Sequence, residues 1–141
     1  MKTYQAEITI DASAQAIWDV LVDTEHYAEW DPGMIRIEGD LALGGKVKFF
    51  TKFSPDQAFA VKVTGFEPGK KMVLTGGMPF GLFKSERTHT LTESDGQTHF
   101  HTAENFSGLL YPLFGKQIPD LTESFNNFVS GLKARAEAGN S

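Results

Sequence analysis

Residues 83–106 read FKSERTHTLTESDGQTHFHTAENF, and the fold can be worked out from this stretch. Its centre, Asp95-Gly96, is a strong signal for a two-residue hairpin turn, because both residues tolerate the positive φ that such a turn requires. The flanking segments alternate in character, as antiparallel strands with one buried face do. Pairing Ser94 with Gln97 fixes the register, which predicts these opposed pairs: Leu91 with Phe100, His89 with Thr102, Arg87 with Glu104, and Ser85 with Phe106.

This register divides the hairpin into two faces of different chemistry. One face holds every large apolar residue of the pair, so we expect it to be concave and buried. Its members are Phe83, Ser85, Arg87, His89, Leu91, Phe100, Thr102, Glu104 and Phe106. The other face carries lysine, glutamate, threonine, histidine and asparagine side chains, and we expect it to meet solvent.

Three polar side chains, Arg87, His89 and Glu104, lie among the phenylalanines of the expected buried face. A buried charge without a partner is costly, so we expect Arg87 and Glu104, which are directly opposed, to pair. One interpretation is a structural ion pair, with His89 hydrogen-bonded to the backbone. The other is a polar anchor, in which Arg87 orients a carboxylate, enolate or phenolate of a ligand while His89 or Glu104 moves a proton.

The N-terminal third predicts one strand and two short helices. Alternation indicates a strand over Lys2–Ile10. Helical spacing of apolar residues then predicts a short helix that ends near Val22, with Asp11 or Ser13 as its N-cap. A second short helical piece is expected over Glu25–Glu29, because the Trp-Asp-Pro sequence after it ends a helix.

The remaining segments predict further strands and one long helix. Four alternating runs before the hairpin indicate strands, separated by turns or loops at Gly44-Gly45, Ser54-Pro55-Asp56, Glu67-Pro68-Gly69 and Gly76–Gly81. After the hairpin we expect an irregular apolar loop over Ser107–Gly115 and an amphipathic helix from about Gln117 to Glu137. Strands closed by helices make an α+β fold, with helices on one face of an antiparallel sheet.

Four local motifs add to this order of elements: IWDVL (17–21), YAEWDP (27–32), FEPGK (66–70) and ENFSGLL (104–110). Together they resemble the START/Bet v 1-like superfamily, and more closely its bacterial polyketide cyclase/dehydrase and lipid-transport group, the SRPBCC proteins. The resemblance covers residues 1–141 and implies a single helix-grip domain. In that fold a curved antiparallel sheet of about seven strands surrounds a long C-terminal helix, with two short helices after the first strand.

The resemblance also implies a cavity between sheet and C-terminal helix for a small molecule. We expect an apolar or amphipathic ligand, lipid-like or polyketide-like, bound by a carrier or sensor. Because one fold hosts many functions, two alternatives stay open. One is an enzyme like the polyketide cyclases and dehydrases, without metal or organic cofactor, in which Arg87, His89 and Glu104 steer enolate chemistry. The other is a cochaperone-like module that binds another protein.

Eight of the twelve phenylalanines are expected to line this space. The expected ligand-binding residues are Arg87, His89, Glu104, Phe49, Phe59, Phe83, Phe100, Phe106, Phe125 and Trp30, and Phe53 and Phe128 share the lining. The same residues would equally fill a closed core. Two apolar segments, Phe80–Phe83 and Leu109–Phe114, form an entrance or simply pack over the core.

Composition limits the remaining function classes. The chain of 141 residues has no cysteine, which excludes disulfides and thiolate zinc sites. A net charge of −5 argues against nucleic acid as the main partner. No apolar run approaches the ~20 residues that span a bilayer, and the N-terminus does not resemble a signal peptide, so we expect a cytoplasmic protein. A homodimer is compatible with the sequence.

A metal site is not expected. His99 and His101 lie two apart on one strand, but no third ligand of suitable type converges on them. Lys46, Lys48 and Lys52 are expected to mark an outer strand face in contact with water.

Overall fold

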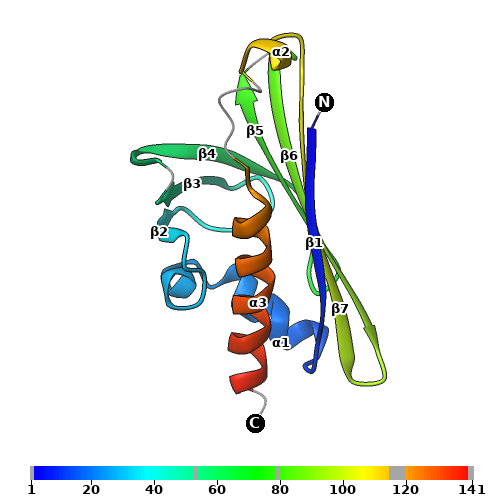
Figure 1. The fold of residues 1–141 in the computed structure, drawn as a ribbon. Helices are drawn as coiled ribbons and strands as arrows, with labels where there is room; N and C mark the ends of the chain where they lie inside the picture. Colours follow the sequence, from blue (N-terminus) through cyan, green and yellow to red (C-terminus); the bar gives the residue numbers. More distant parts are fainter. Residues whose placement is uncertain (1, 53, 79, 115–119, 140–141) are drawn as a thin grey trace.

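The computed structural model describes residues 2–52, 54–78, 80–114 and 120–139. It consists of one antiparallel sheet and a few helices (Figure 1). The elements in chain order are β1 (Lys2–Ile10), α1 (Ala14–Val22), the 3-10 helix η1 (Thr24–Glu29), β2 (Met34–Glu38), β3 (Lys46–Thr51), β4 (Ser54–Glu67), β5 (Lys71–Met78), β6 (Phe83–Ser94), β7 (Gln97–Ser107), α2 (Tyr111–Phe114) and α3 (Thr122–Gly139).

The seven strands lie in the order β1-β7-β6-β5-β4-β3-β2, so that sequence neighbours pair and β1 closes onto β7. The sheet curls around α3, which runs along its concave side (Figure 1). The β6–β7 register is the predicted one: Ser94 pairs with Gln97, and Arg87 lies opposite Glu104. Asp95 and Gly96 both have positive φ, of 54° and 81°, as the predicted turn requires.

The N-terminal elements also confirm the prediction. The Ser13 side chain accepts a hydrogen bond from the Ala16 amide and caps α1. Ile17, Trp18 and Leu21 form the buried face of this helix. The Trp18 ring contacts Phe66 of β4, with centroids 5.1 Å apart, so Trp18 packs α1 against the sheet.

Several boundaries differ from the prediction. β4 begins at Ser54, where we expected a turn, because it pairs with β3 immediately and takes up the extra residues in a bulge before Phe59. β5 continues through Gly76 and Gly77 into the expected loop, since it stays paired with β6 as far as Met78. The apolar loop after β7 contains a short helix, α2, and α3 begins at Thr122. The expected start of the last helix near Gln117 lies outside the described residues, as does Phe53.

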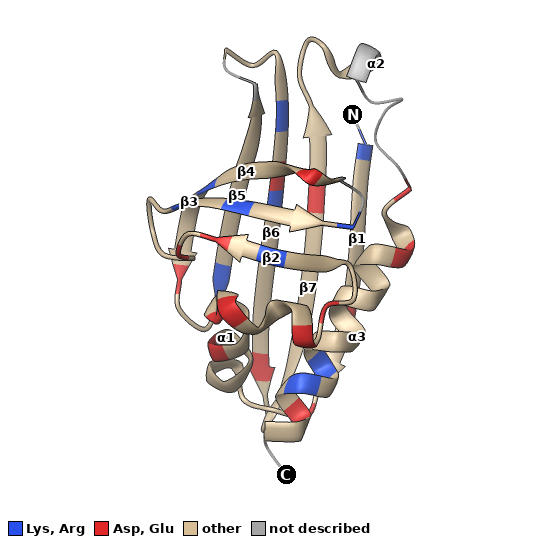
Figure 2. Ribbon diagram, turned by 90° about the vertical axis from the view of Figure 1, so that its left-hand side faces the viewer, with Lys and Arg blue, Asp and Glu red and all other residues tan. Residues whose placement is uncertain are grey.

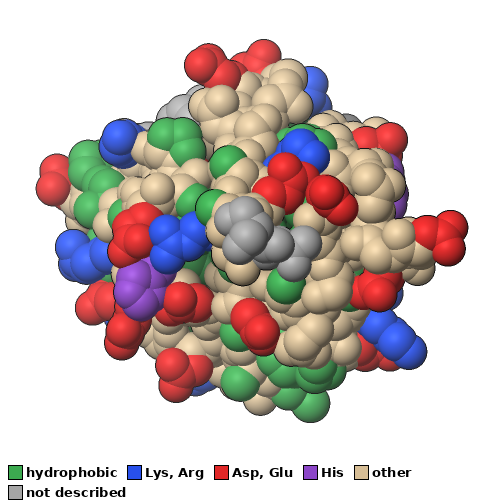
Figure 3. Space-filling model, turned by 90° about the horizontal axis from the view of Figure 1, so that it is seen from below, with side chains coloured by type: hydrophobic (Ala, Val, Ile, Leu, Met, Phe, Trp, Pro, Cys, Tyr) green, Lys and Arg blue, Asp and Glu red, His purple; other side chains and the backbone are tan. Residues whose placement is uncertain are grey.

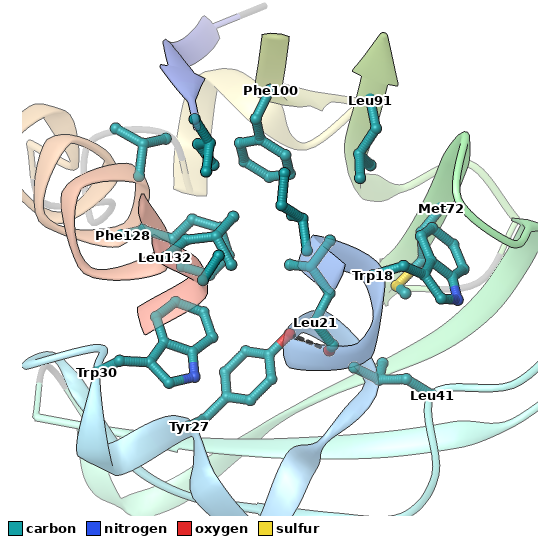
Figure 4. Close-up of a cluster of buried hydrophobic side chains, with 14 of the residues drawn as sticks. Trp18, Leu21, Tyr27, Trp30, Leu41, Met72, Leu91, Phe100, Phe128 and Leu132 are labelled. Carbon is teal, nitrogen blue, oxygen red and sulfur yellow. Dashed lines mark hydrogen bonds between the residues drawn. The ribbon is translucent and has the colours of Figure 1, made fainter. Parts of the chain in front are cut away.

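The core lies between α1, α3 and the concave face of the sheet (Figure 4). Figure 4 shows Trp30, Phe128 and Leu132 on one side and Leu91 and Phe100 on the other. At Gly131 the backbone of α3 lies so close to the Trp30 carbonyl that a Cβ would collide with it. This glycine therefore lets the helix approach the η1–β2 connection, at a cost of roughly 1 kcal/mol in helix propensity.

Among the described residues, no helix combines the length and the hydrophobicity needed to cross a membrane.

Candidate functional site

The three polar residues predicted on the concave face lie close together beneath α3. His89 and Glu104 are 3% and 7% exposed. Arg87 keeps partial exposure, but its Nη2 atom is fully buried. Opposed positions on adjacent strands account for this placement, since alternation sends the side chains of Arg87, His89 and Glu104 to the same face.

The Arg87 guanidinium is held by one side-chain hydrogen bond and two aromatic rings. Its Nε donates to the Thr102 hydroxyl at 3.0 Å. The guanidinium carbon lies 4.2 Å from the ring centre of Phe125 and 4.7 Å from that of Phe128, both on α3. Nη2 has no hydrogen-bond partner among the described residues. The guanidinium is thus held in place by Thr102 and the two rings, while its Nη2 donor makes no hydrogen bond with the described residues.

The expected ion pair between Arg87 and Glu104 is not formed. No oxygen of Glu104 lies within 4.0 Å of an Arg87 nitrogen, although the two residues are opposed across the strands. The reason is that Arg87 turns toward α3 and bonds to Thr102, the diagonal neighbour, instead of reaching straight across. Glu104 still acts on Arg87 electrostatically: burial lowers the pKa of Arg87, and the charge of Glu104 opposes that shift.

Burial changes the acid–base character of the other two groups. It lowers the pKa of His89 well below 6.5, and the nearby Arg87 cation lowers this pKa further. Burial raises the pKa of Glu104, against the influence of Arg87. His89 is therefore neutral at neutral pH, and Glu104 holds a proton more readily than a carboxyl in water.

A hydrogen bond to a side chain orients the His89 ring. The structural interpretation of the sequence had expected a hydrogen bond to the backbone instead. Its Nδ1 lies 3.0 Å from the Thr102 hydroxyl. Since that hydroxyl accepts from Arg87, it is satisfied by donating its proton to Nδ1, which leaves the ring proton on Nε2. The ring is also stacked on Phe128, at 5.4 Å and an interplanar angle of 10°.

Three residues that the sequence analysis did not single out belong to this cluster: Thr102, Asp31 and Tyr27. Asp31 is 6% exposed, and burial raises the pKa of its carboxyl group. The hydrogen bond from the Gly33 amide and the charge of Arg87 lower this pKa and offset part of the shift. The buried Tyr27 hydroxyl donates to the Leu21 carbonyl (dashed line in Figure 4). Burial raises the pKa of Tyr27. The hairpin register already placed Thr102 on the concave face. Tyr27 lies in the short helix η1 and Asp31 in the connection that follows it, and no periodicity reveals the burial of either.

The aromatic residues expected to line the space differ in exposure. Phe100, Phe106, Phe125 and Trp30 are buried, and Phe49 and Phe83 are partly exposed. Trp30 contacts Tyr27 and Phe128, with ring centres 4.6 Å and 5.2 Å apart. Phe59 shares the concave row of Phe49 but is 41% exposed. The concave face is therefore closely packed near Phe100 and less covered near Phe59.

The two apolar segments expected at an entrance do lie together. Backbone hydrogen bonds join Leu109 to Gly81 at 3.1 Å and Leu110 to Leu82 at 2.7 Å. Phe80 and Leu109 are 92% and 78% exposed, so these two side chains do not pack over the core. The side chains of Leu113 and Phe114 lie outside the described part of the chain.

A pocket of about 310 Å³ lies between the η1–β2 connection and the start of α3. Its lining residues are Pro32, Gly33, Lys52, Asp120, Glu123, Ser124 and Asn127. Arg87, His89 and Glu104 do not line it. The pocket lies next to the buried cluster, since Pro32 and Gly33 follow Asp31 in the chain, and Ser124 and Asn127 directly precede Phe125 and Phe128.

The strand histidines face away from the cluster. His101 Nε2 lies 3.0 Å from the Gln5 side chain, and His99 lies 3.7 Å from Glu7, both across to β1 on the outer face. Within the described ranges, no group of three histidine, aspartate or glutamate residues is placed to hold a metal ion.

The comparisons with known proteins agree on family and fold. Residues 1–137 match the family described as polyketide cyclase/dehydrase and lipid transport. No curated protein matches the chain. A protein from Thermus thermophilus superposes with a TM-score of 0.74 at 15% identity, covering 99% of this chain and 100% of that one.

Two further solved structures have descriptive names. The Zhui aromatase/cyclase from Streptomyces sp. R1128 gives a TM-score of 0.72 at 12% identity, over 99% of this chain and 96% of its own. A START superfamily protein from Mycobacterium smegmatis gives 0.69 at 14% identity, over 96% and 97%. At these identities the likeness shows the shared helix-grip fold, which confirms the predicted fold class.

Proposed function

The chain belongs to the polyketide cyclase/dehydrase and lipid transport family, and on that premise we propose that it binds an apolar or amphipathic small molecule between the sheet and α3. In this proposal Arg87 holds an anionic oxygen of the ligand. The observation that carries the proposal is the fully buried Nη2 of Arg87, which has no partner among the described residues. Leaving such a donor unsatisfied costs roughly 1–3 kcal/mol, which an acceptor on a ligand would recover.

The surroundings of Arg87 favour a ligand with a large apolar part. Phe125 and Phe128 cover the guanidinium from α3, and Phe106 continues the apolar surface along β7. Toward β3 and β4 the concave face is less covered, since Phe59 is 41% exposed. An apolar chain or fused ring system lying on this face would bury the exposed part of Phe59 while its acidic group met Arg87.

A matched pair of probes tests this assignment: a dansyl-labelled fatty acid and its methyl ester, which differ in the negative charge. We expect the parent protein to bind the acid about tenfold more tightly than the ester, the effect of one charge-assisted hydrogen bond. Arg87→Met should bind both probes with equal affinity. Arg87→Lys, which keeps the charge but not the fork of donors, should retain part of the preference.

Arg36→Met is the matched control for this experiment. Arg36 is exposed and also lies over a phenylalanine ring, that of Phe50 at 3.8 Å, so the substitution removes the same charge from a similar contact outside the site. The control should keep the preference for the acid. Equal binding of acid and ester by the parent would refute the anchor. Failure of both probes to bind, with no small molecule retained in native mass spectrometry of fresh protein, would refute ligand binding altogether.

A second function, catalysis like that of the polyketide cyclases, is favoured by one specific observation. Neutral His89 and the readily protonated Glu104 lie on the same apolar surface as the Arg87 cation. His89 would take a proton from the carbon beside a ketone, and Arg87 would stabilise the resulting enolate. Conversion of a poly-β-ketone thioester, followed by mass spectrometry, should then fall about 100-fold in His89→Gln. Binding without conversion in the parent would reject the enzyme.

The cytoplasmic location expected from the sequence is part of this proposal and stays a prediction.

A further inference from the structure

A second hollow lies on the outer side of the sheet, away from the buried cluster. It has a volume of about 1020 Å³ and lies where β3 and β4 meet β5 and β6. Its lining residues are Glu38, Gly39, Lys46, Val47, Lys48, Ala60, Val61, Lys62, Thr75, Gly76, Gly77, Gly81, Phe83 and Lys84. We call it the lysine pocket.

The lysine pocket is strongly positive in a chain whose net charge is −5. Four lysines line it, namely Lys46, Lys48, Lys62 and Lys84, against one acidic residue, Glu38. In Figure 2 the blue segments of β3, β4 and β6 lie near one another on the sheet. By contrast, acidic side chains are spread over the lower end of the molecule in Figure 3. A hollow lined by one sign of charge focuses the field and attracts ions of the opposite sign.

Most of this positive charge is not neutralised within the protein. Lys84 pairs with Glu86 at 3.3 Å. In the described part of the chain, Lys46, Lys48 and Lys62 have no acidic group within 4.0 Å, although Glu38 is opposite Lys48 across the strands. The three ammonium groups are therefore available to an external anion.

The strand register places two of these lysines in an unfavourable pair. Lys46 lies directly opposite Lys62 across the antiparallel β3–β4 pair, and like charges in that position destabilise a sheet. The next residue along this row, across from Lys62 on β5, is Thr75, which is neutral. An anion bound between Lys46 and Lys62 would remove this repulsion, whereas none of the described residues supplies an acidic group there.

Small residues keep the centre of the pocket free of side chains. Ala60 and Gly77 occupy outward positions on β4 and β5, where longer side chains would fill the hollow. Gly77 has a φ of 117°, and a Cβ there would collide with the Phe83 carbonyl. The close approach of β5 and β6 at this point thus requires a glycine at position 77, and the lysines surround the hollow beside it.

We infer that the lysine pocket binds a phosphate-bearing ligand, independently of the site beneath α3. Lysine ammonium groups act as point charges for phosphate oxygens, and several of them around one hollow favour a multiply charged anion over a single carboxylate. The phosphate belongs either to a soluble compound or to the head group of an anionic lipid, since the chemistry of recognition is the same.

Tripolyphosphate, measured by calorimetry at low ionic strength, is the probe for the soluble source. Vesicles of phosphatidylglycerol and phosphatidylcholine, compared with phosphatidylcholine alone in sedimentation, test the lipid source. We expect at least one of the two probes to bind. In Lys46→Gln/Lys62→Gln that binding should weaken about tenfold or more, because two charge-assisted contacts are lost. Arg87→Met should leave it unchanged, which separates this pocket from the proposed ligand site.

Lys70→Gln/Lys71→Gln is the matched control, since it removes the same charge from exposed positions around the β4–β5 turn. Binding in the control should change less than about twofold, the effect of net charge alone. An equal loss in both double variants would overturn the inference, because attraction would then follow net charge and not the pocket. Absence of binding of both probes to the parent would overturn it as well. The lysine variant should also unfold at a temperature no lower than the parent, since the substitution removes the Lys46–Lys62 repulsion.

Discussion

The two faces of the β6–β7 hairpin carry the same kinds of side chain in opposite environments. On the outer face, Lys84 pairs with Glu86 at 3.3 Å, and both side chains are well exposed. On the concave face, Arg87 and Glu104 are directly opposed but more than 4.0 Å apart, and the cation lies against Phe125 and Phe128. The charged groups of the outer face can hydrogen-bond to water when they lose their protein partner. The buried groups of the concave face can bond only to neighbouring side chains or to a ligand beneath α3.

The effect of a charged or titratable group on stability and chemistry therefore depends more on its location than on its residue type. His101, on the outer face, contacts Gln5 beside solvent, while burial lowers the pKa of His89 on the concave face well below 6.5. Substitutions of the same chemical kind on the two faces should therefore have very different effects, which makes the comparison testable.

The largest effect is expected for Arg87→Met. Loss of the cation leaves Glu104 and Asp31 buried without its attraction and removes the donor to Thr102. We expect the free energy of unfolding in urea to fall by about 3 kcal/mol at neutral pH, because two buried carboxyl groups lose the nearby cation that favours their charged form, although neither is bonded to it. Arg87→Met/Glu104→Gln, in which the unsupported carboxylate is gone, should recover more than half of this loss. A double variant no more stable than the single one would show that the two charges are not coupled.

A smaller effect, visible only in acid, is expected for His89→Gln. Because the pKa of His89 is lowered in the folded protein, the unfolded chain binds a proton below pH 6.5 that the folded protein does not. The parent therefore loses stability as the pH falls, by about 1.4 kcal/mol from this residue between about pH 7.5 and about pH 5.5. Urea titrations at both pH values should show the parent losing more stability than His89→Gln by this amount.

The raised pKa values of Glu104 and Asp31 act in the opposite direction, since the folded protein binds their protons more tightly. Both residues are present in parent and variant, so the difference between the two proteins isolates His89. His101→Gln, the same substitution on the outer face, is the control for the loss of a histidine side chain from this hairpin. Identical pH dependence of the parent and His89→Gln would mean that the ring is protonated as readily in the folded as in the unfolded state.

The smallest effect is expected for the outer pair. Lys84→Ala and Glu86→Ala should each change the free energy of unfolding by less than about 0.5 kcal/mol, because exposed ion pairs contribute little in water. Thermal unfolding at low and high salt checks this expectation. A loss as large as that of Arg87→Met would erase the distinction between the faces.

The sequence predicts the hairpin closely because its information is local. Asp95-Gly96 specifies the turn, and once Ser94 faces Gln97 every opposed pair down to Ser85 and Phe106 follows. The chain therefore tells which residues share the concave face. The sequence does not show which rotamers these side chains adopt. The predicted ion pair between Arg87 and Glu104 was wrong for that reason.

Tertiary contacts decided the rest of the candidate site. Asp31 and Tyr27 belong to the cluster because η1 and the η1–β2 connection lie against α3, where Gly131 lets the helix approach the Trp30 carbonyl closely. Likewise the strand pattern marked Lys46 and Lys48 as outward-facing, but only the bend of the sheet brings them around one hollow with Lys62 and Lys84.

The order of elements, the register of the hairpin and the fold class follow from the sequence, because turns, alternation and helical spacing act between residues that are near in the chain. Which polar groups are left without partners depends on how the sheet and the helices pack together. Arg87 bonds to Thr102 and lies against the rings of Phe125 and Phe128, and does not reach Glu104. This arrangement depends on where α3 lies against the sheet. Burial and pairing are properties of the assembled layers, and no local pattern contains them.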